Sequence, residues 1–524
     1  MKIVIVGGGT SGWMAALKFL QWARRQSKNI TEIKVIESSK IGIVGAGEGS
    51  TGMFTDFIWD VVINEFGETH TEFLKETGST LKLGIRFKDW NGLDTEYLSP
   101  IQTPFTSKNN IDFAFLHYLA EGKAHLSSDV GYLMEAGLST IPIKETINTD
   151  NGGHSYHFDA HKVGKYFKKV ALNNGVKVID SEVLKLNRNS TNGSLKSVKL
   201  SNGETVYGDF WIDCSGFNKV LIEPMGGGWK SYSEYLPTNK AIPYVYPHND
   251  VPKLETTAWA QNNGWMWQIP TQERLGCGYV FSDYFTNEDD ALDELQKTTG
   301  RKIEPIRTIN FEAGRVENFW VKNVVAVGLS SGFLEPLQAT AIHTTLIQLN
   351  LLTEHQFLDN KKALLSDDII KHYNKRISKL SDDFRDLIQI HYITKRDDTD
   401  FWKYCNDGLP KTDFVKYILE ICKYRSPSIF DFDTYYGSAA WGVMSWTLAG
   451  LGLITKENAE TQLLTLPQKL KGDLKRAISH LEKIRNLNDS RLMTQTDFWN
   501  RIKDGKLYEQ SKLPINQIDW RGFV

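Results

Sequence analysis

The first residues whose types and spacing suggest chemistry are glycines close to the start of the chain. Gly7–Gly12 reads Gly-Gly-Gly-Thr-Ser-Gly, a G-x-G-x-x-G pattern. In such a pattern one glycine permits a tight turn, one lets the backbone approach a pyrophosphate, and one allows close helix–strand packing. A carboxylate at Glu37 would accept hydrogen bonds from ribose hydroxyls. The residues expected to bind the dinucleotide are Gly7, Gly9, Thr10, Ser11, Gly12 and Glu37.

The elements around these glycines are those that a nucleotide site requires. The apolar run Lys2–Val6 is typical of a strand buried on both faces, and a helical pattern extends from Trp13 to Arg24. Glu32 to Glu37 is predicted to be the second strand, with the carboxylate at its end. Strand, glycine turn, helix and acid together predict a Rossmann-like unit with a dinucleotide at the helix N-terminus.

Two further segments carry groups that could contact a ligand. Gly45–Thr51 is rich in glycine, so its backbone amides could crowd a ligand, although an ordinary flexible loop has the same composition. Asn323–Leu337 is predicted to be a strand, a glycine turn and a helix start. The amides of such a turn could hold an anion.

A lysine stands in an alternating segment further along the chain. From Leu81 onward, Thr80–Phe87 alternates apolar residues with polar or basic ones, which predicts a strand with one buried face. Lys82 and Arg86 would share the other face. The pattern alone favours solvated side chains, as for most lysines.

Two tryptophans one residue apart form the most unusual aromatic feature. Asn263–Pro270 is predicted to be a strand that ends at its proline. Alternation places Trp265, Trp267 and Ile269 on one face and Met266 on the other. Two adjacent indoles make a stiff, flat wall. An isolated pair of this kind is more often a packing feature of a sheet.

Taken in order, these motifs resemble the flavin-dependent halogenases, of the tryptophan-halogenase type. The resemblance extends from residue 1 to about residue 455 and is specific at Gly7–Gly12, at the Lys-x-Gly-x-Arg-Phe context of Lys82, at the Trp-x-Trp-x-Ile-Pro of Trp265–Pro270, and at Gly328–Leu337. It implies an α/β fold, in which a three-layer, Rossmann-like FAD-binding domain of the flavin monooxygenase type precedes a mainly α-helical C-terminal domain.

The resemblance also implies roles for individual residues. Lys82 matches the essential lysine, and Gln338 stands where most members carry a Glu that helps it. Thr103 replaces a His that tryptophan-specific members carry, which puts tryptophan itself in doubt as the substrate. The resemblance also implies a loop that straps over the flavin and further flavin contacts, at Glu48, Ser50, Thr51, Gly328, Gly332 and Leu337. It implies a halide site at Thr340 and Ala341 and a substrate contact at Phe105. A tunnel wall between the flavin, where the oxidant is made, and the substrate would consist of Trp265, Trp267, Ile269 and Pro270.

The implied reaction uses reduced FAD, O2 and a halide ion to make hypohalous acid, which halogenates an electron-rich aromatic small molecule. A separate flavin reductase is expected to supply the reduced FAD, because the sequence has one convincing dinucleotide fingerprint. An aromatic hydroxylase of the same fold and a flavoprotein that only binds remain as alternatives. Gln338 cannot supply a carboxylate's charge, so we expect bromide or iodide to be preferred over chloride.

Composition excludes several other classes of function. Lys and Arg number 61 and Asp and Glu 63, so no basic field for nucleic acid or for a membrane surface is expected. The four cysteines show no metal-ligand spacing, so no metal site is predicted, and they fit a reducing compartment. The longest apolar run is too short to cross a bilayer. A soluble cytoplasmic protein is predicted, and a homo-oligomer remains open.

The length of 524 residues predicts more than one domain. We expect residues 1–350 to form the FAD-binding domain, with a substrate-facing segment at about 80–150. Residues 351–524 are expected to form a mainly helical domain that covers the substrate.

Overall fold

The structure is a computed structural model that describes residues 1–25, 29–42, 48–102, 113–144, 153–247, 250–354, 366–432 and 435–507. The chain forms two compact units that interleave along the sequence. Unit 1 comprises Met1–Gly78, Phe158–Tyr232 and Glu312–Asp382, and unit 2 comprises Ser79–His157, Ser233–Phe311 and Asp383–Val524. The predicted division into a FAD-binding and a substrate-covering domain near residue 350 stays a prediction.

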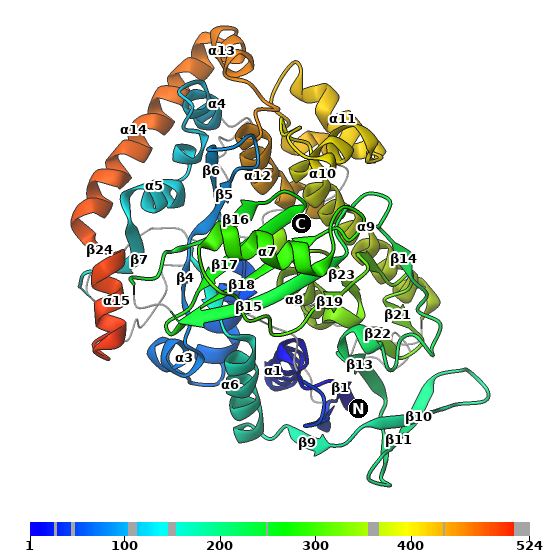
Figure 1. Cartoon of the computed structure of the whole chain (residues 1–524). Helices are drawn as coiled ribbons and strands as arrows, with labels where there is room; N and C mark the ends of the chain where they lie inside the picture. Colours follow the sequence, from blue (N-terminus) through cyan, green and yellow to red (C-terminus); the bar gives the residue numbers. More distant parts are fainter. Residues whose placement is uncertain are drawn as a thin grey trace. The chain divides into compact units, whose positions relative to one another are not determined.

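Unit 1 is organised around a sheet of mainly parallel strands (Figure 1). Its strand order is β21 (Trp320–Val321), β22 (Val324–Ala326), β13 (Phe210–Asp213), β1 (Lys2–Val6), β2 (Glu32–Glu37) and β9 (Lys177–Asp180). The pairs β22–β13, β13–β1, β1–β2 and β2–β9 are parallel. The buried, branched residues of β1 explain its central place, since parallel strands are covered on both faces.

Unit 1 also contains helices, short turns and strands that lie outside this sheet. Helix α1 (Thr10–Arg25) packs against α6 (Ala160–Asn173) and α8 (Thr340–Glu354). The remaining elements are β3 (Glu48–Gly49), α2 (Gly52–Phe57), η1 (Ile58–Ile63), α3 (His70–Thr77), β10 (Val183–Arg188), β11 (Leu195–Leu200), β12 (Thr205–Tyr207), η3 (Gly216–Asn218), β14 (Lys230–Ser231), β20 (Gly314–Arg315), η4 (Gly328–Ser330), β23 (Gly332–Phe333) and η5 (Pro336–Gln338).

Unit 2 is organised around a longer, mixed sheet. Its strand order is β19 (Ile309–Asn310), β15 (Lys240–Pro247), β18 (Arg274–Phe281), β17 (Gly264–Pro270), β16 (Glu255–Ala260), β5 (Gly84–Lys88) and β6 (Glu96–Pro100). One face of this sheet packs on α7 (Glu288–Thr299), which crosses the green strands in Figure 1. Met266, Cys277 and Leu295 are among the buried residues of this core.

A short antiparallel pair in unit 2 carries the lysine singled out above. Strand β4 (Thr80–Lys82) pairs with β8 (Ser155–Phe158). The predicted single strand over Thr80–Phe87 is therefore wrong, because the chain changes sheets at Leu83. There the Leu83 amide donates to the Leu254 carbonyl at 2.6 Å, and β5 continues alongside β16.

The rest of unit 2 is mainly helical, as predicted for the later part of the chain. Helix α9 (Asp367–His391) contains the boundary between the units, and its buried positions recur at three- and four-residue steps, as in an amphipathic helix. The other elements are α4 (Phe113–Ala120), η2 (Ala124–Ser127), α5 (Asp129–Ala136), β7 (Leu138–Pro142), α10 (Asp400–Lys403), η8 (Tyr404–Gly408), α11 (Asp413–Cys422), η9 (Ile429–Asp431), α12 (Tyr435–Gly450), α13 (Lys456–Leu464), α14 (Gln468–Arg491), β24 (Leu492–Thr494) and α15 (Gln495–Lys503).

Candidate functional site

The nucleotide turn, Gly7–Gly12, connects β1 to α1 as the sequence predicts. Gly7 has a φ of +117°, and its amide donates to the Ile36 carbonyl at 2.8 Å. A Cβ on Gly7 would lie 2.1 Å from the Cys214 carbonyl oxygen, and one on Gly12 would lie 1.9 Å from the Gly7 carbonyl oxygen. Both positions therefore require glycine.

The middle of the nucleotide turn is different, because a Cβ on Gly9 would meet nothing within 4 Å. Helix α1 begins at the next residue, Thr10, whose hydroxyl donates to the Ala160 carbonyl at 3.3 Å. A pyrophosphate would fit in this space, because Gly9 has no side chain and lies at the start of a long helix. Ser11 lies against Gly328, because a Cβ on Gly328 would lie 2.5 Å from the hydroxyl oxygen of Ser11.

Glu37 lies at the carboxyl end of β2, next to the nucleotide turn. A Cβ on Gly8 would lie 1.9 Å from one carboxylate oxygen of Glu37, and the other oxygen accepts a hydrogen bond from the Lys168 ammonium. The carboxylate is therefore held at the strand end, where ligands bind in doubly wound folds. Its predicted contact with a ribose stays a prediction.

The strap residues follow in unit 1. Ser50 is fully buried, and burial raises the pKa of the half-buried Glu48 carboxyl to about 7. Thr51 precedes α2, and its hydroxyl lies 2.9 Å from Nδ1 of His343 on α8. Because α8 begins at Thr340, this contact joins the strap to the first turn of the helix that carries the predicted halide residues.

The third glycine motif forms two short turns and a strand before α8, so the helix starts later than predicted. Gly328 begins η4, Gly332 lies in β23, and Leu337 is buried in η5. Gln338 ends η5 with 9% of its surface exposed. Ala339 then takes a φ of +55°.

After that reversal α8 begins at Thr340, which is buried, and Ala341, which is exposed. The first amides of a helix have no partner within it and point toward its N-terminal end. The helix dipole adds positive potential there, so this start has the chemistry to hold an anion.

Asp213, at the end of β13, organises the neighbouring turn and was not singled out from the sequence. Its carboxylate accepts hydrogen bonds from the Ser215, Leu221 and Ile222 amides at 3.0, 2.7 and 2.8 Å. Burial raises the pKa of this carboxyl. The signal available in the sequence was an acid directly after an apolar strand and before Cys-Ser-Gly.

In unit 2, Lys82 is buried, with 3% of its surface exposed. Burial lowers the pKa of its ammonium to about 7. The expectation from pattern alone, a solvated lysine, is therefore wrong. Arg86, expected on the same face, instead pairs with Glu255 at 3.0 Å and with Glu96 at 2.7 Å. A lysine that can lose its proton near neutral pH is a candidate for catalysis.

The tryptophan wall consists of Trp265, Trp267, Ile269 and Pro270 on β17, all buried. The two indole centroids are 6.3 Å apart at 58°. Trp267 lies on Gly278 of β18, where a Cβ would approach the ring to 2.0 Å.

The predicted alternation along β17 is confirmed. Met266 points to the opposite face, where the Tyr244 hydroxyl lies 2.8 Å from its sulfur.

One contact that the sequence did not predict links Lys82's strand to the tryptophan wall. The Thr80 hydroxyl donates to the Pro270 carbonyl at 2.7 Å. The structure thus brings the lysine strand and the end of the wall together within unit 2. Phe105, the predicted substrate contact, lies outside the described residues.

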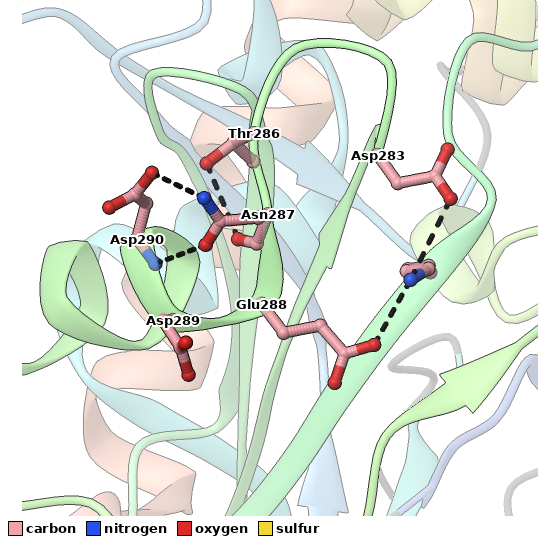
Figure 2. Close-up of a pocket in the computed structure, with 7 residues that line it drawn as sticks. Asp283, Thr286, Asn287, Glu288, Asp289 and Asp290 are labelled. Atoms are coloured by element: carbon pink, nitrogen blue, oxygen red, sulfur yellow. Dashed lines mark hydrogen bonds and ion pairs between the residues drawn. The ribbon is translucent and has the colours of Figure 1, made fainter.

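A surface hollow elsewhere in unit 2 is polar and differs in kind from these features. Figure 2 shows its acidic residues around the start of α7, where Asn287 accepts from the Asp290 amide at 2.9 Å. Lys240 bonds Glu288 at 3.0 Å. The acids of the first turn complement the positive end of the helix, and Glu288 and Asp283 also pair with Lys240, so a structural role accounts for them.

Metal ligation and membrane insertion are both without support in the part of the chain that the structure describes. No group of three or more His, Cys, Asp or Glu residues there is placed to hold a metal ion. No helix among those residues is long and apolar enough to span a membrane.

Known proteins with similar sequences identify the family of this chain. The tryptophan halogenase family model matches residues 2–465. The tryptophan 6-halogenase ThaL of Streptomyces albogriseolus is 28% identical over 521 residues, which cover 90% of this chain and 95% of that protein. The tryptophan 7-halogenase RebH of Lentzea aerocolonigenes is 28% identical, with 89% and 92% covered.

Among solved structures, the flavin-dependent halogenase BrvH from Brevundimonas sp. BAL3 superimposes with a TM-score of 0.80 at 26% identity, covering 96% of this chain and 99% of that one. The predicted α/β fold of the FAD-binding, Rossmann-like type is confirmed. The chain belongs to the tryptophan halogenase family and is a flavin-dependent halogenase.

Proposed function

We propose that this enzyme halogenates an electron-rich carbon of a small aromatic molecule of the indole or phenol class, using Lys82 as the catalytic residue. The observation that carries the proposal is a buried lysine, whose ammonium has a pKa of about 7, on a strand joined to the tryptophan wall. A hydroxylase that places its substrate at the flavin has no need of such a lysine.

The residues present in unit 1 fit FAD. We propose that the nucleotide turn and Glu37 bind its dinucleotide, and that the strap residues Glu48, Ser50 and Thr51 with Gly328, Gly332 and Leu337 line its flavin. Gly9 supports this proposal, because a Cβ there would meet no protein atom within 4 Å, which leaves space for a pyrophosphate. Reduced FAD, when bound, supplies with O2 the oxidation of a halide to hypohalous acid.

Lys82 can act on hypohalous acid in either protonation state. Its ammonium can donate a hydrogen bond to the oxidant and make the halogen more electrophilic. Its neutral amine can instead form a haloamine, with loss of water, and then pass the halogen to the aromatic carbon. Because its pKa is about 7, both states are populated near neutral pH. In either case the ring carbon gains the halogen and loses a proton.

We assign the halide to the first turn of α8, at Thr340 and Ala341. We also propose that the enzyme prefers bromide or iodide over chloride. The preference rests on Gln338, which cannot supply the negative charge of a carboxylate. Chloride is the hardest of the three halides to oxidise, so a weakened site loses chlorination first. Equal concentrations of the three halides with one indole or phenol should give little chlorinated product. Chlorinated product in excess contradicts the assignment.

Dependence on a separate flavin reductase is typical of the family. We propose that this enzyme has the same need, because the nucleotide turn is the one dinucleotide fingerprint in its sequence. NADH or NADPH alone should therefore fail to reduce its bound FAD. Rapid reduction without an added reductase would refute this.

Product mass tests the proposed reaction. The enzyme, a flavin reductase and a panel of indoles and phenols are incubated with and without bromide, and the products are analysed by mass spectrometry. We expect a brominated product that disappears without bromide. A hydroxylated product that forms equally in both reactions identifies a monooxygenase and contradicts the proposal.

A further inference from the structure

Four groups from four strands of unit 2 form one hydrogen-bonded chain beside Lys82. The Thr80 hydroxyl donates to the Pro270 carbonyl at 2.7 Å. The same oxygen lies 3.5 Å from Nδ1 of His157, a long contact, and Nε2 of His157 lies 2.9 Å from the Thr256 hydroxyl. Thr80, His157 and Thr256 are buried. We call Thr256, His157, Thr80 and Pro270 the Thr80 chain.

The chemistry of the groups fixes the direction of each hydrogen bond. The Pro270 carbonyl can only accept, so the Thr80 hydroxyl must donate to it. The Thr80 oxygen then accepts the proton on Nδ1 of His157, which leaves Nε2 as an acceptor for the Thr256 hydroxyl. The Thr80 chain is therefore satisfied in one arrangement, with a neutral imidazole. Burial, together with the positive charge of Lys82, keeps the pKa of His157 well below its usual value.

Register places this chain next to the catalytic lysine. Thr80 is opposite His157, and Lys82 is opposite Ser155, in the antiparallel pair of β4 and β8. Side chains two residues apart on a strand share a face, as do opposed side chains in a pair. The Thr80 and Lys82 side chains therefore leave β4 on the same side. The other end of the chain is Pro270, the last residue of the tryptophan wall.

We propose that Thr80 and His157 are positioning residues that hold Lys82 in register with the end of the tryptophan wall. This inference rests on the proposed function of Lys82. The reacting nitrogen of a lysine stands at the end of a long side chain, so it can be placed no more precisely than the backbone that carries it. A shift of the strand would therefore move the nitrogen. Placement matters because an error of about 1 Å in a reacting group can reduce a rate by about 100-fold.

Thr80 offers a matched pair of variants that separates hydrogen bonding from packing. Thr80→Val keeps the shape and strand preference of the side chain but removes the hydroxyl, whereas Thr80→Ser keeps the hydroxyl and removes a methyl group. Each is compared with the wild type in melting temperature and FAD affinity, and in hypohalous acid production without aromatic substrate, measured with a soluble halogen acceptor. These values should stay close to those of the wild type, because Thr80 is assigned no flavin contact.

The deciding readouts are halogenated product per hypohalous acid formed, and the rate at which Lys82 is acetylated in the flavin-free protein, followed by peptide mass spectrometry. We expect Thr80→Val to lose about tenfold or more of the product yield and to acetylate Lys82 several-fold faster, with Thr80→Ser within about twofold of the wild type. Equal values for the two variants overturn the proposal. If Thr80→Val does not fold, Thr256→Val and Thr256→Ser provide the same comparison one step along the chain.

A Lys82→Ala control distinguishes this inference from the function on which it rests. If Lys82→Ala loses halogenation while the two Thr80 variants behave alike, the positioning role alone is wrong. If Lys82→Ala keeps halogenation, the proposed function fails, and the positioning role fails with it. In the Lys82→Ala background the Thr80→Val change should have no further effect on product yield, because nothing is left for it to position.

Discussion

The nucleotide turn of unit 1 and the lysine site of unit 2 are built in opposite ways. The nucleotide turn depends on side chains that are absent, since a Cβ at Gly7 or Gly12 would collide with backbone atoms. The lysine site depends on a charged side chain that is buried, with 3% of Lys82 exposed. We propose that the first binds through backbone amides and helix geometry, and that the second acts through one titrating group.

This difference explains what each site tolerates. A binding turn made of backbone can be blocked by any added side chain. It buries no charged group, so it has no desolvation penalty. A buried ammonium destabilises the folded state, because desolvation disfavours the charged form. The lysine site therefore keeps a group that reduces stability, which is common where function requires a shifted pKa.

The largest effect should come from closing the nucleotide turn. Gly12→Ala places a methyl group 1.9 Å from the Gly7 carbonyl oxygen, which is backbone and cannot move aside cheaply. We expect this variant to lose FAD binding and to melt at a much lower temperature. Gly9→Ala is the matched control, because its methyl group meets nothing in the protein.

Gly9→Ala should melt like the wild type yet bind FAD more weakly, as titration of the flavin fluorescence would show. If Gly9→Ala binds FAD as well as the wild type, the pyrophosphate does not lie beside Gly9.

The next effect should come from neutralising the buried charge. In the folded protein the pKa of Lys82 is about 7, below the 10.5 of an ordinary lysine. Between these values the unfolded chain binds more protons than the folded one, so the stability of the wild type rises with pH through this window. Below it, the full cost of the buried ammonium is present.

Lys82→Met removes this group and this pH dependence. Its advantage in unfolding free energy over the wild type should shrink by about 3 kcal/mol between about pH 6.5 and about pH 9.5. Denaturant unfolding at several pH values measures it. A constant difference across the window would show that Lys82 keeps an ordinary pKa.

A smaller effect is expected at the support of the tryptophan wall. Gly278→Ala places a methyl group 2.0 Å from the ring of Trp267, which must move to make room. Overpacking of this kind costs about 1–3 kcal/mol. The variant should unfold at lower denaturant concentration and lose halogenated product in proportion to the shift of the indole, while FAD affinity stays unchanged. Loss of FAD binding would contradict the expectation that the wall residues act on the substrate side only.

The sequence predicted the first site better than the second for a physical reason. Glycine spacing, a buried strand and a terminal acid act over a short range, so Gly7–Gly12 and Glu37 could be placed from local pattern. Burial of Lys82 could not, because its desolvation comes from strands far apart in the sequence. The pairing of β4 with β8 and the Thr80–Pro270 hydrogen bond are contacts of that kind.

Local pattern also misled where the chain changes sheets. Alternation from Leu81 to Phe87 continues unbroken, yet the backbone turns at Leu83 to bond Leu254. Periodicity shows which side chains lie on the same face of a strand, but it does not show which sheet the strand joins. The catalytic role of Lys82 was implied by the family resemblance and stays a prediction, whereas its burial and lowered pKa come from the structure. The roles of Gln338, Thr340 and Ala341 stay predictions.

We propose that the oxidant is made beside the flavin and is used at a second site, through Lys82. Both steps can be measured in one bromide reaction, as brominated aromatic product and as hypobromous acid captured by a soluble acceptor, for the wild type and Lys82→Ala. We predict that the variant makes hypobromous acid at the wild-type rate and yields less than about 1% of the brominated product. Folded Lys82→Ala that brominates the substrate at a substantial fraction of the wild-type rate would contradict the claim.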